Sequence, residues 1–352
     1  DPERRTAAME KNPEISQMLS MLPMPREIIT PVEESPGTDV NLSSLVEGIN
    51  ASGIPVYHWG GFRDGYTQST FRWYANGSDS TKMTVGPWTH AGHQDPRDKE
   101  GARLLAIETR RWFDRWLKDM PNGVEDEAPI HYAVATNPDH NETAQARFDG
   151  FDFHQAEQWP PAASADMTFY LSCKNDGVGK LSHTPEKEAS ERSFKVDYSR
   201  TTGSKSRYYD TAGQGPMAYP DMNTHANGAL IFETEPFTEE MDIVGFPLLD
   251  FSATSTAPDG NFHVFIQEVD ADGTAHFLSN GAIRASHGET ADAPFNTLNM
   301  PWSASSREAI ERAAKLNESP ISLSVAMQPI ANHFEKEHRL RIVIAGADAD
   351  NS

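Results

Sequence analysis

Short apolar runs alternate with amphipathic segments between residues 51 and 125. The run IPVYHW (54–59) is almost wholly apolar, and TKMTVGPW (81–88) has the pattern of a second strand buried on both faces of a parallel sheet. Residues 66–77 and 103–120 carry apolar side chains at helical spacing. The order strand, helix, strand, helix predicts the C-terminal part of a larger parallel α/β sheet.

The first 50 residues mix short helical patterns with loops. Ile15, Met18, Leu19 and Leu22 lie at helical spacing ahead of two prolines, and residues 42–50 repeat the pattern. Two short helices are therefore expected before the first strand.

The pattern changes after about residue 125, where apolar residues alternate with polar ones. Phe262, Val264 and Ile266 share one face of such a run, and the Asp-Gly pair within 269–278 predicts a hairpin. Strand-like runs occupy 130–136, 167–173, 229–234, 246–255, 261–270, 321–330 and 338–346. Many short strands between Gly, Pro and Asn turns predict a β-sandwich over residues 126–352, with the domain boundary in PNGVEDEAP, residues 121–129.

Charge narrows the range of partners. The formal net charge of -22 comes from 52 acidic and 30 basic residues, which argues against binding to nucleic acid or to an anionic membrane surface. A single cysteine, Cys173, rules out an intrachain disulfide and a cysteine-based zinc cluster. Whether the chain forms a homo-oligomer stays open, and so does its compartment, which could be cytoplasmic or secreted.

Two ionisable residues follow the two predicted parallel strands. Asp64 lies five residues beyond the first strand, and His90 lies two residues beyond the second. Neighbouring parallel strands bring such loops to one edge of a sheet. A carboxylate there can accept the Nδ1–H of an imidazole, whose other nitrogen can then take a proton from a nucleophile. The alternative is that both residues are solvated or cap a turn.

The sequence segments around these residues resemble those of a known family. GGFRDGY (60–66) and GPWTH (86–90) are similar to the segments that carry the acid and the histidine in the cocaine esterase-like (CocE/NonD) serine hydrolases and the related X-prolyl dipeptidyl peptidases. Residues 241–286 and 327–346 are similar to stretches of the C-terminal jelly-roll of that family, with Glu337 in place of its usual glycine.

The resemblance implies roles for individual residues. It makes Asp64 the acid of a catalytic triad and His90 the general base, in preference to His93. It places Tyr66 in the acyl pocket, although a packed aromatic is an equal alternative. His58 is expected to be a core histidine, and Arg63 either lowers the pKa of Asp64 or points to solvent.

The nucleophile of such a triad is not evident in the chain. No G-x-S-x-G elbow occurs in the sequence. We expect the serine in an upstream segment or a separate chain. Residues 1–50 would then be a partial helical cap, residues 51–125 the last part of an α/β-hydrolase domain, and residues 126–352 a jelly-roll that is incomplete at its end. A degenerate homologue that lost its serine is the alternative.

The sequence thus predicts a serine hydrolase that cleaves an ester or amide of a small or peptide-like acyl substrate through an acyl-enzyme. It predicts no metal and no organic cofactor. An X-Pro dipeptidyl peptidase or amino-acid ester hydrolase activity is one alternative. A noncatalytic binding protein with relic triad residues is another.

Overall fold

The computed structural model describes residues 42–90, 99–136, 151–173, 177–211, 217–225, 228–304, 306–313 and 315–351. The predicted helix around residues 15–22 and most of the predicted cap lie outside these residues. Among the helices that the structure describes, none has the length and apolar character needed to cross a membrane.

The α/β part follows the predicted order of elements. It contains α4 (Leu42–Ser52), β1 (Tyr57–Gly61), α5 (Thr67–Ala75), β2 (Lys82–Gly86) and α6 (Lys99–Lys118). Strands β1 and β2 pair in parallel, which confirms the sheet type. The first strand begins at Tyr57 rather than at residue 54, because Pro55 has no N–H to give to a ladder.

The β-rich part has more strands than the sequence predicted. A six-stranded sheet has the order β11-β10-β14-β7-β6-β5, and β12 pairs with β9. The strands are β3 (Ile130–Ala135), β4 (Phe151–Ala156), β5 (Tyr170–Ser172), β6 (Gly179–Ser182), β7 (Ala229–Glu233), β8 (Met241–Gly245), β9 (Leu248–Ala253), β10 (Asn261–Val269), β11 (Ala275–Arg284), β12 (Ile321–Ala326), β13 (Ile330–Phe334) and β14 (Arg339–Ala345), with short helices α7 (Arg207–Thr211), η3 (Met222–His225), η4 (Ala285–His287) and α8 (Arg307–Ala313) between them.

One predicted strand is wrong. Residues 321–330 form no single strand, because β12 ends at Ala326 and β13 begins at Ile330 in a different sheet. Pro329 lies between them and cannot donate to a ladder. The chain therefore changes sheets at this point.

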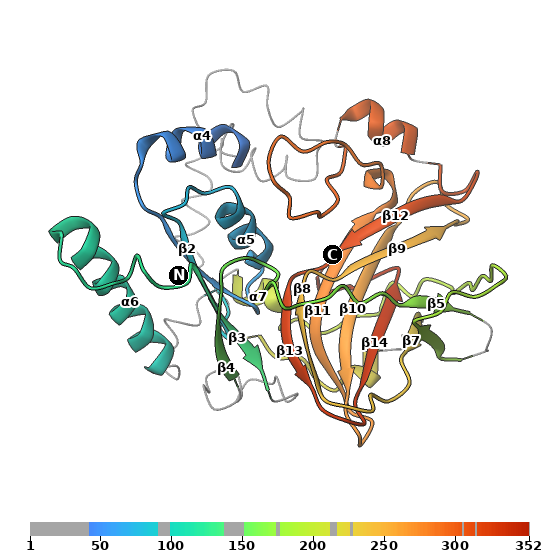
Figure 1. Cartoon of the computed structure of the whole chain (residues 1–352). Helices are drawn as coiled ribbons and strands as arrows, with labels where there is room; N and C mark the ends of the chain where they lie inside the picture. Colours follow the sequence, from blue (N-terminus) through green and yellow to red (C-terminus); the bar gives the residue numbers. More distant parts are fainter. Residues whose placement is uncertain are drawn as a thin grey trace, which may run out of the picture.

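A shared sheet joins the two parts of the molecule. The predicted strand 130–136 was grouped with the sandwich, yet β3 pairs in parallel with β2. Strand β13 then pairs with β3 and with β8, which gives the order β1-β2-β3-β13-β8. Figure 1 shows the α/β part beside the sandwich, with β3 and β4 between them. The domain boundary at 121–129, the jelly-roll topology and the helical cap stay predictions.

Separate apolar clusters fill the two parts of the molecule. Phe71 of α5 packs with Met83, Val85 and Ile130 on one face of the parallel strands. Ala331 of β13 belongs to the same cluster, so the sandwich contributes to this core. The core of the sandwich lies between its sheets and includes Phe232, Leu249, Val264, Ile266, Val325, Phe334 and Ile344.

Candidate active site

The segments that follow β1 and β2 are held together by backbone hydrogen bonds. The N–H of Phe62 donates to the carbonyl of Gly86 at 3.0 Å, and the N–H of Arg63 donates to that of Trp88 at 3.3 Å. These bonds extend the parallel pairing beyond the strands themselves. As a result the two loops leave the sheet at the same edge.

Two glycines permit this close approach. A Cβ on Gly61 would lie 1.9 Å from the carbonyl oxygen of Trp88, and one on Gly86 would lie 2.2 Å from the Trp88 ring. The ring of Trp88 stacks on Trp59 of β1 with 4.8 Å between centroids. Packing thus explains the Gly-Gly and Gly-Pro-Trp sequences that precede the two ionisable residues.

Asp64 is positioned by a tight turn. Its N–H donates to the carbonyl of Gly61 at 3.1 Å, and its Oδ1 accepts the N–H of Tyr66 at 2.9 Å. An aspartate that accepts a backbone N–H two residues ahead stabilises its own turn. The carboxylate consequently has a fixed direction.

The structure brings Asp64 and His90 together. Nδ1 of His90 lies 3.1 Å from Oδ2 and 3.2 Å from Oδ1 of Asp64. The Asp64 side chain is 12% exposed, whereas that of His90 is 44% exposed. With Nδ1 directed at the carboxylate, Nε2 becomes the nitrogen that can exchange a proton with another group.

Tyr66 completes the group of predicted site residues. Its ring centroid lies 5.4 Å from that of His90 in an edge arrangement. The side chain is 57% exposed. It is therefore an exposed neighbour of the histidine rather than a packed core aromatic.

Three neighbouring residues have other positions. His58 lies in β1, and burial lowers its pKa to about 4. Arg63 is buried, and its guanidinium lies 5.7 Å from the centroid of the Phe151 ring, so the expectation that it points to solvent is wrong. His93 lies outside the described residues.

Sequence reasoning missed two residues that contact the Asp64 loop from the sandwich. Nη1 of Arg207 donates to the carbonyl of Asp64 at 3.3 Å. Oε1 of Gln328 accepts the N–H of Gln68 at 3.0 Å. No local pattern marks them, because they are far from the loop in the sequence.

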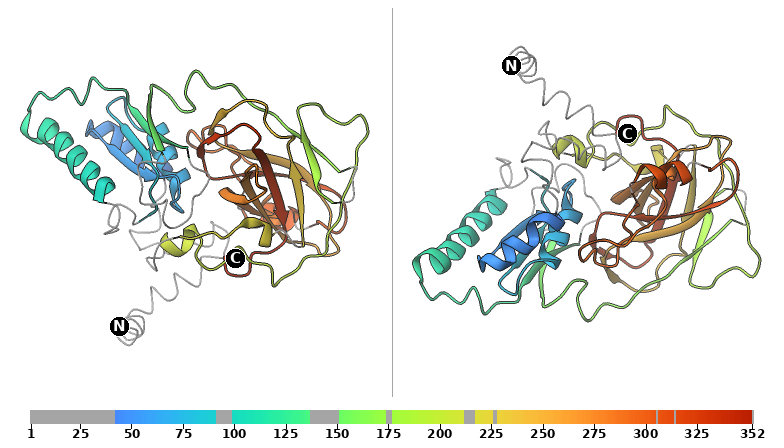
Figure 2. Two further views of the ribbon diagram at one scale, coloured as in Figure 1. Left: turned by 90° about the horizontal axis from the view of Figure 1, so that it is seen from below. Right: turned by 90° about the horizontal axis from the view of Figure 1, so that it is seen from above.

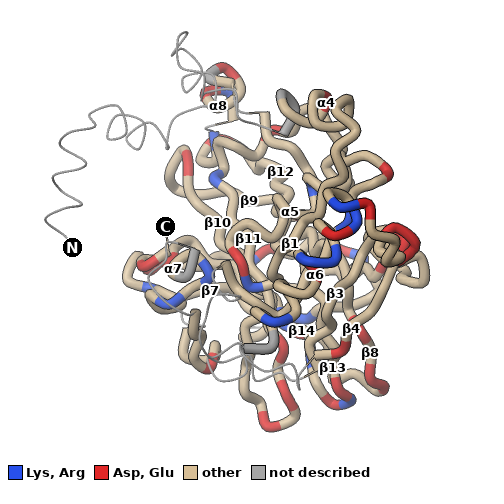
Figure 3. The backbone as a smooth tube through the Cα atoms, turned by 90° about the vertical axis from the view of Figure 1, so that its left-hand side faces the viewer, with Lys and Arg blue, Asp and Glu red and all other residues tan. Residues whose placement is uncertain are grey.

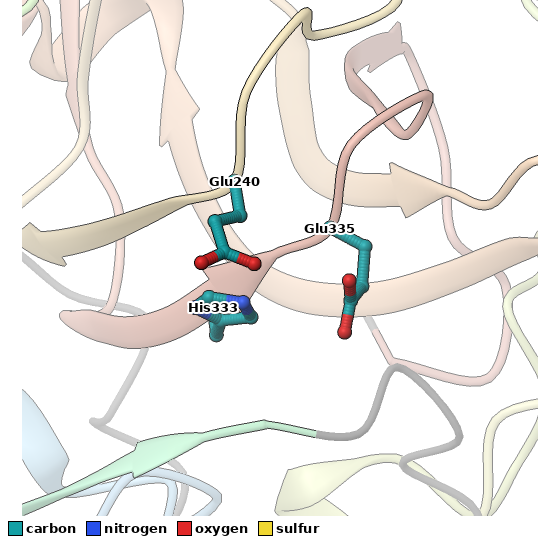
Figure 4. Close-up of side chains that lie close together, drawn as sticks. All are labelled: Glu240, His333 and Glu335. Carbon is teal, nitrogen blue, oxygen red and sulfur yellow. The ribbon is translucent and has the colours of Figure 1, made fainter.

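A group that could hold a cation lies elsewhere, on β13 and beside β8. Glu240, His333 and Glu335 each offer a ligand atom, and these atoms lie within 4.8 Å of one another (Figure 4). Burial disfavours protonation of His333, but a hydrogen bond of 2.7 Å to Asp242 and the charge of Asp242 outweigh burial and raise its pKa. Figure 3 shows acidic positions around this end of the sheet. Both glutamates are exposed, and exposed acidic groups of this kind are common without a metal.

A cavity of about 430 Å³ lies away from Asp64 and His90. Its lining includes Trp59 and Thr84 from the sheet and Arg103 and Glu108 from α6. Figure 2 shows α6 at the end of the molecule remote from the sandwich. The face between α6 and the parallel strands is thus only partly filled by the described residues.

The fold and site define a protein in which a parallel α/β unit and a β-sandwich share one sheet, with an aspartate–histidine pair at the sheet edge. Residues 122–352 match the family profile described as the X-Pro dipeptidyl-peptidase C-terminal non-catalytic domain. Residues 16–92 match the X-Pro dipeptidyl-peptidase (S15 family) profile. The chain therefore belongs to the family of the X-Pro dipeptidyl-peptidase C-terminal non-catalytic domain.

Similar proteins carry hydrolase names. A Mycobacterium bovis protein named as a serine esterase is 26% identical over 338 residues, which is 92% of this chain and 50% of that protein. The cocaine esterase of a Rhodococcus species is 22% identical over 75% of this chain and 47% of its own. A CocE/NonD family hydrolase from Staphylococcus aureus has a similar fold, with a TM-score of 0.59, 17% identity and coverage of 84% of this chain and 46% of that one. The chain thus spans about half the length of the curated relatives it matches.

Proposed function

We propose that this chain supplies the acid and the general base of a serine hydrolase that cleaves an ester or amide through an acyl-enzyme. The observation that carries the proposal is the contact of 3.1 Å between Nδ1 of His90 and Oδ2 of Asp64. The exposure of the His90 ring supports it, because a general base must reach both the nucleophile and the leaving group.

In this reaction the serine Oγ bonds to the substrate carbonyl carbon. Nε2 of His90 takes the serine hydroxyl proton as this bond forms. The imidazolium gives this proton to the leaving group as the ester or amide bond breaks, and the acyl-enzyme remains. Water then attacks the acyl carbon with the same help from His90 and frees the serine. Asp64 keeps the Nδ1–H oriented and stabilises the imidazolium in both steps.

We further propose that another segment supplies the serine. Two surfaces support this. Within the described part of the chain, β1 is the last strand of its sheet, so one edge has no partner strand. Ile107, Phe113 and Leu117 of α6 are exposed apolar side chains. A further strand and helix would cover these surfaces, since parallel sheets are buried on both faces and exposed apolar patches mark interaction sites.

Tyr66 is the residue we assign to the acyl pocket. Its exposed ring stands beside the base. If it contacts the acyl group, Tyr66→Ala should raise KM several-fold while Tyr66→Phe should leave KM unchanged. Equal effects of the two substitutions would assign the role to the hydroxyl instead.

The proposal is tested with the full-length gene product and a substrate panel. The panel compares p-nitrophenyl esters with and without an α-amino group, and an X-Pro p-nitroanilide. A burst of p-nitrophenol followed by slower turnover would support an acyl-enzyme. Turnover of the X-Pro p-nitroanilide alone would instead favour a dipeptidyl peptidase. If no member of the panel is cleaved, the proposed hydrolase activity fails and a binding role gains support.

A further inference from the structure

The loop that carries Asp64, residues 61–68, is contacted from the sandwich at two points. We call these residues the acid loop. Within the loop, Oγ1 of Thr67 lies 2.5 Å from the carbonyl of Gly61 and 2.7 Å from that of Asp64. A hydroxyl has one proton, so Thr67 cannot fully satisfy both carbonyls. A carbonyl oxygen has two lone pairs, so the Asp64 carbonyl can also accept from a second donor.

Arg207 is this second donor. Its Nη1 donates to the Asp64 carbonyl at 3.3 Å, and its side chain is fully buried. The guanidinium lies 5.4 Å from the centroid of the Phe277 ring in β11. The Arg207 N–H also donates to the hydroxyl of Tyr219, whose ring stacks on Phe277. Arg207 is thus anchored to the sandwich before it reaches the acid loop.

Gln328 makes the second contact. Oε1 accepts the N–H of Gln68 at 3.0 Å, and Nε2 lies 3.5 Å from the carbonyl of Gly65. The backbone of Gln328 is itself fixed to β11, through Asn280 at 3.0 Å and the hydroxyl of Ser279 at 2.6 Å. The part of the acid loop from Asp64 to Gln68 is therefore tied to a single strand of the sandwich.

The burial of Arg207 needs a reason other than the packing of the sandwich against the α/β part. Transfer of a charged group from water into a protein interior is costly unless hydrogen bonds and nearby charges compensate for it. Apolar contacts already join the two parts, since Ala331 of β13 packs in the core around Phe71. The additional polar contacts converge on the few residues that orient one carboxylate.

We propose that Arg207 and Gln328 are positioning residues that set the orientation of the Asp64 carboxylate towards His90. This inference rests on the proposed function of the pair. It assigns to the sandwich, which the family description calls non-catalytic, a part in aligning the triad. Misplacement of a catalytic group by about 1 Å is enough to lower a rate by about a hundredfold.

The first test needs no catalytic activity and uses the chain with 15N-labelled histidine and backbone. The reporters are the Nδ1–H signal of His90 and the exchange rates of the Tyr66 and Gln68 amides. Gln328→Ala should speed exchange of both amides about tenfold, which corresponds to the loss of about one hydrogen bond. It should also weaken the Nδ1–H signal. Gln328→Glu keeps the acceptor for Gln68 and should restore its protection.

Matched controls lie in the same sandwich. Gln267 and Arg341 are buried and hydrogen-bond to each other in β10 and β14. Gln267→Ala and Arg341→Lys should leave all three reporters within about twofold of the wild type, since no hydrogen bond of these residues reaches the acid loop. Arg207→Lys should behave like Gln328→Ala, and Gln328→Ala carries the test alone if Arg207→Lys does not fold.

The outcomes separate this inference from the proposed function. If Gln328→Ala changes only the Gln68 amide, the contact is structural and the positioning role is wrong. If the wild-type Nδ1–H signal is insensitive to Asp64→Asn, the Asp64–His90 pair itself fails. In the full-length enzyme, Gln328→Ala should lower kcat about ten- to a hundredfold with KM within twofold. A change in KM alone would overturn the inference.

Discussion

Asp64 and His90 follow neighbouring strands of one sheet, yet their surroundings differ. The Asp64 loop is bonded to its own turn, to the segment after β2 and to the sandwich. The His90 side chain is 44% exposed, is hydrogen-bonded to Asp64 and lies beside the Tyr66 ring. The comparison teaches that the contacts which fix the geometry of the pair are made by the Asp64 loop rather than by His90. The ring of His90, the proposed base, is left open to other groups.

The largest effect should come from His90→Ala. Loss of the general base should lower kcat by about 10⁴-fold or more in the full-length enzyme. Because the ring is exposed, the free energy of unfolding should change by less than about 0.5 kcal/mol. Steady-state kinetics and urea unfolding measure the two effects. Retained turnover would show that another residue is the base.

Asp64→Asn should come next. The amide can still accept the N–H of Tyr66, but it no longer favours the correct tautomer or the imidazolium of His90. We expect a fall in kcat of about 10³- to 10⁴-fold, measured by the same kinetics. Asp79→Asn is the matched control at an exposed position and should have normal turnover. A near-normal rate for Asp64→Asn would mean that another carboxylate orients the histidine.

These two residues could be predicted from the sequence because their signals are local. Each follows a short buried strand, and parallel pairing brings neighbouring strand ends together. Arg207 and Gln328 could not be predicted, since 143 residues separate Arg207 from Asp64 and 260 separate Gln328 from Gln68. Their contacts arise only when the sandwich folds against the sheet.

The same reason explains the errors in the fold. Alternating polarity identified β3 as a strand but not its partner, because periodicity does not encode which strand lies beside it. Strands β12 and β13 were merged because apolar residues continue across Pro329. The position of the two loops of the site was predicted correctly, because the segment between the two strands has the length of an ordinary crossover.

A substitution at Gly61 tests the contact that joins the two loops. An added Cβ would meet the Trp88 carbonyl at 1.9 Å, so Gly61→Ala should reduce the free energy of unfolding by about 2–3 kcal/mol. Gly48→Ala is the control, because nothing lies within 4 Å of its added Cβ in α4. It should stabilise the protein by up to about 1 kcal/mol in the same urea titration. Equal stabilities would contradict the close packing of the strand ends.

The smallest effect concerns His58, a half-buried histidine in the strand that leads to Asp64. Burial lowers its pKa to about 4, below the value of about 6.5 expected in the unfolded chain. The unfolded state therefore binds the proton first, and stability should decrease as the pH falls from 6.5 to 4, by at most about 1.4 kcal/mol per pH unit. His58→Gln should remove this part of the pH dependence. Identical slopes for wild type and variant in urea unfolding at several pH values would show that His58 does not contribute.

The most direct test of the central claim is the rate at which a fluorophosphonate probe labels the full-length gene product, with peptide mapping of the adduct. We expect the adduct on a single serine, and His90→Ala should slow labelling by several orders of magnitude, because His90 activates that serine. Labelling that is independent of His90, or a sample in which no polypeptide is labelled, would contradict the assignment of Asp64 and His90 to a catalytic triad.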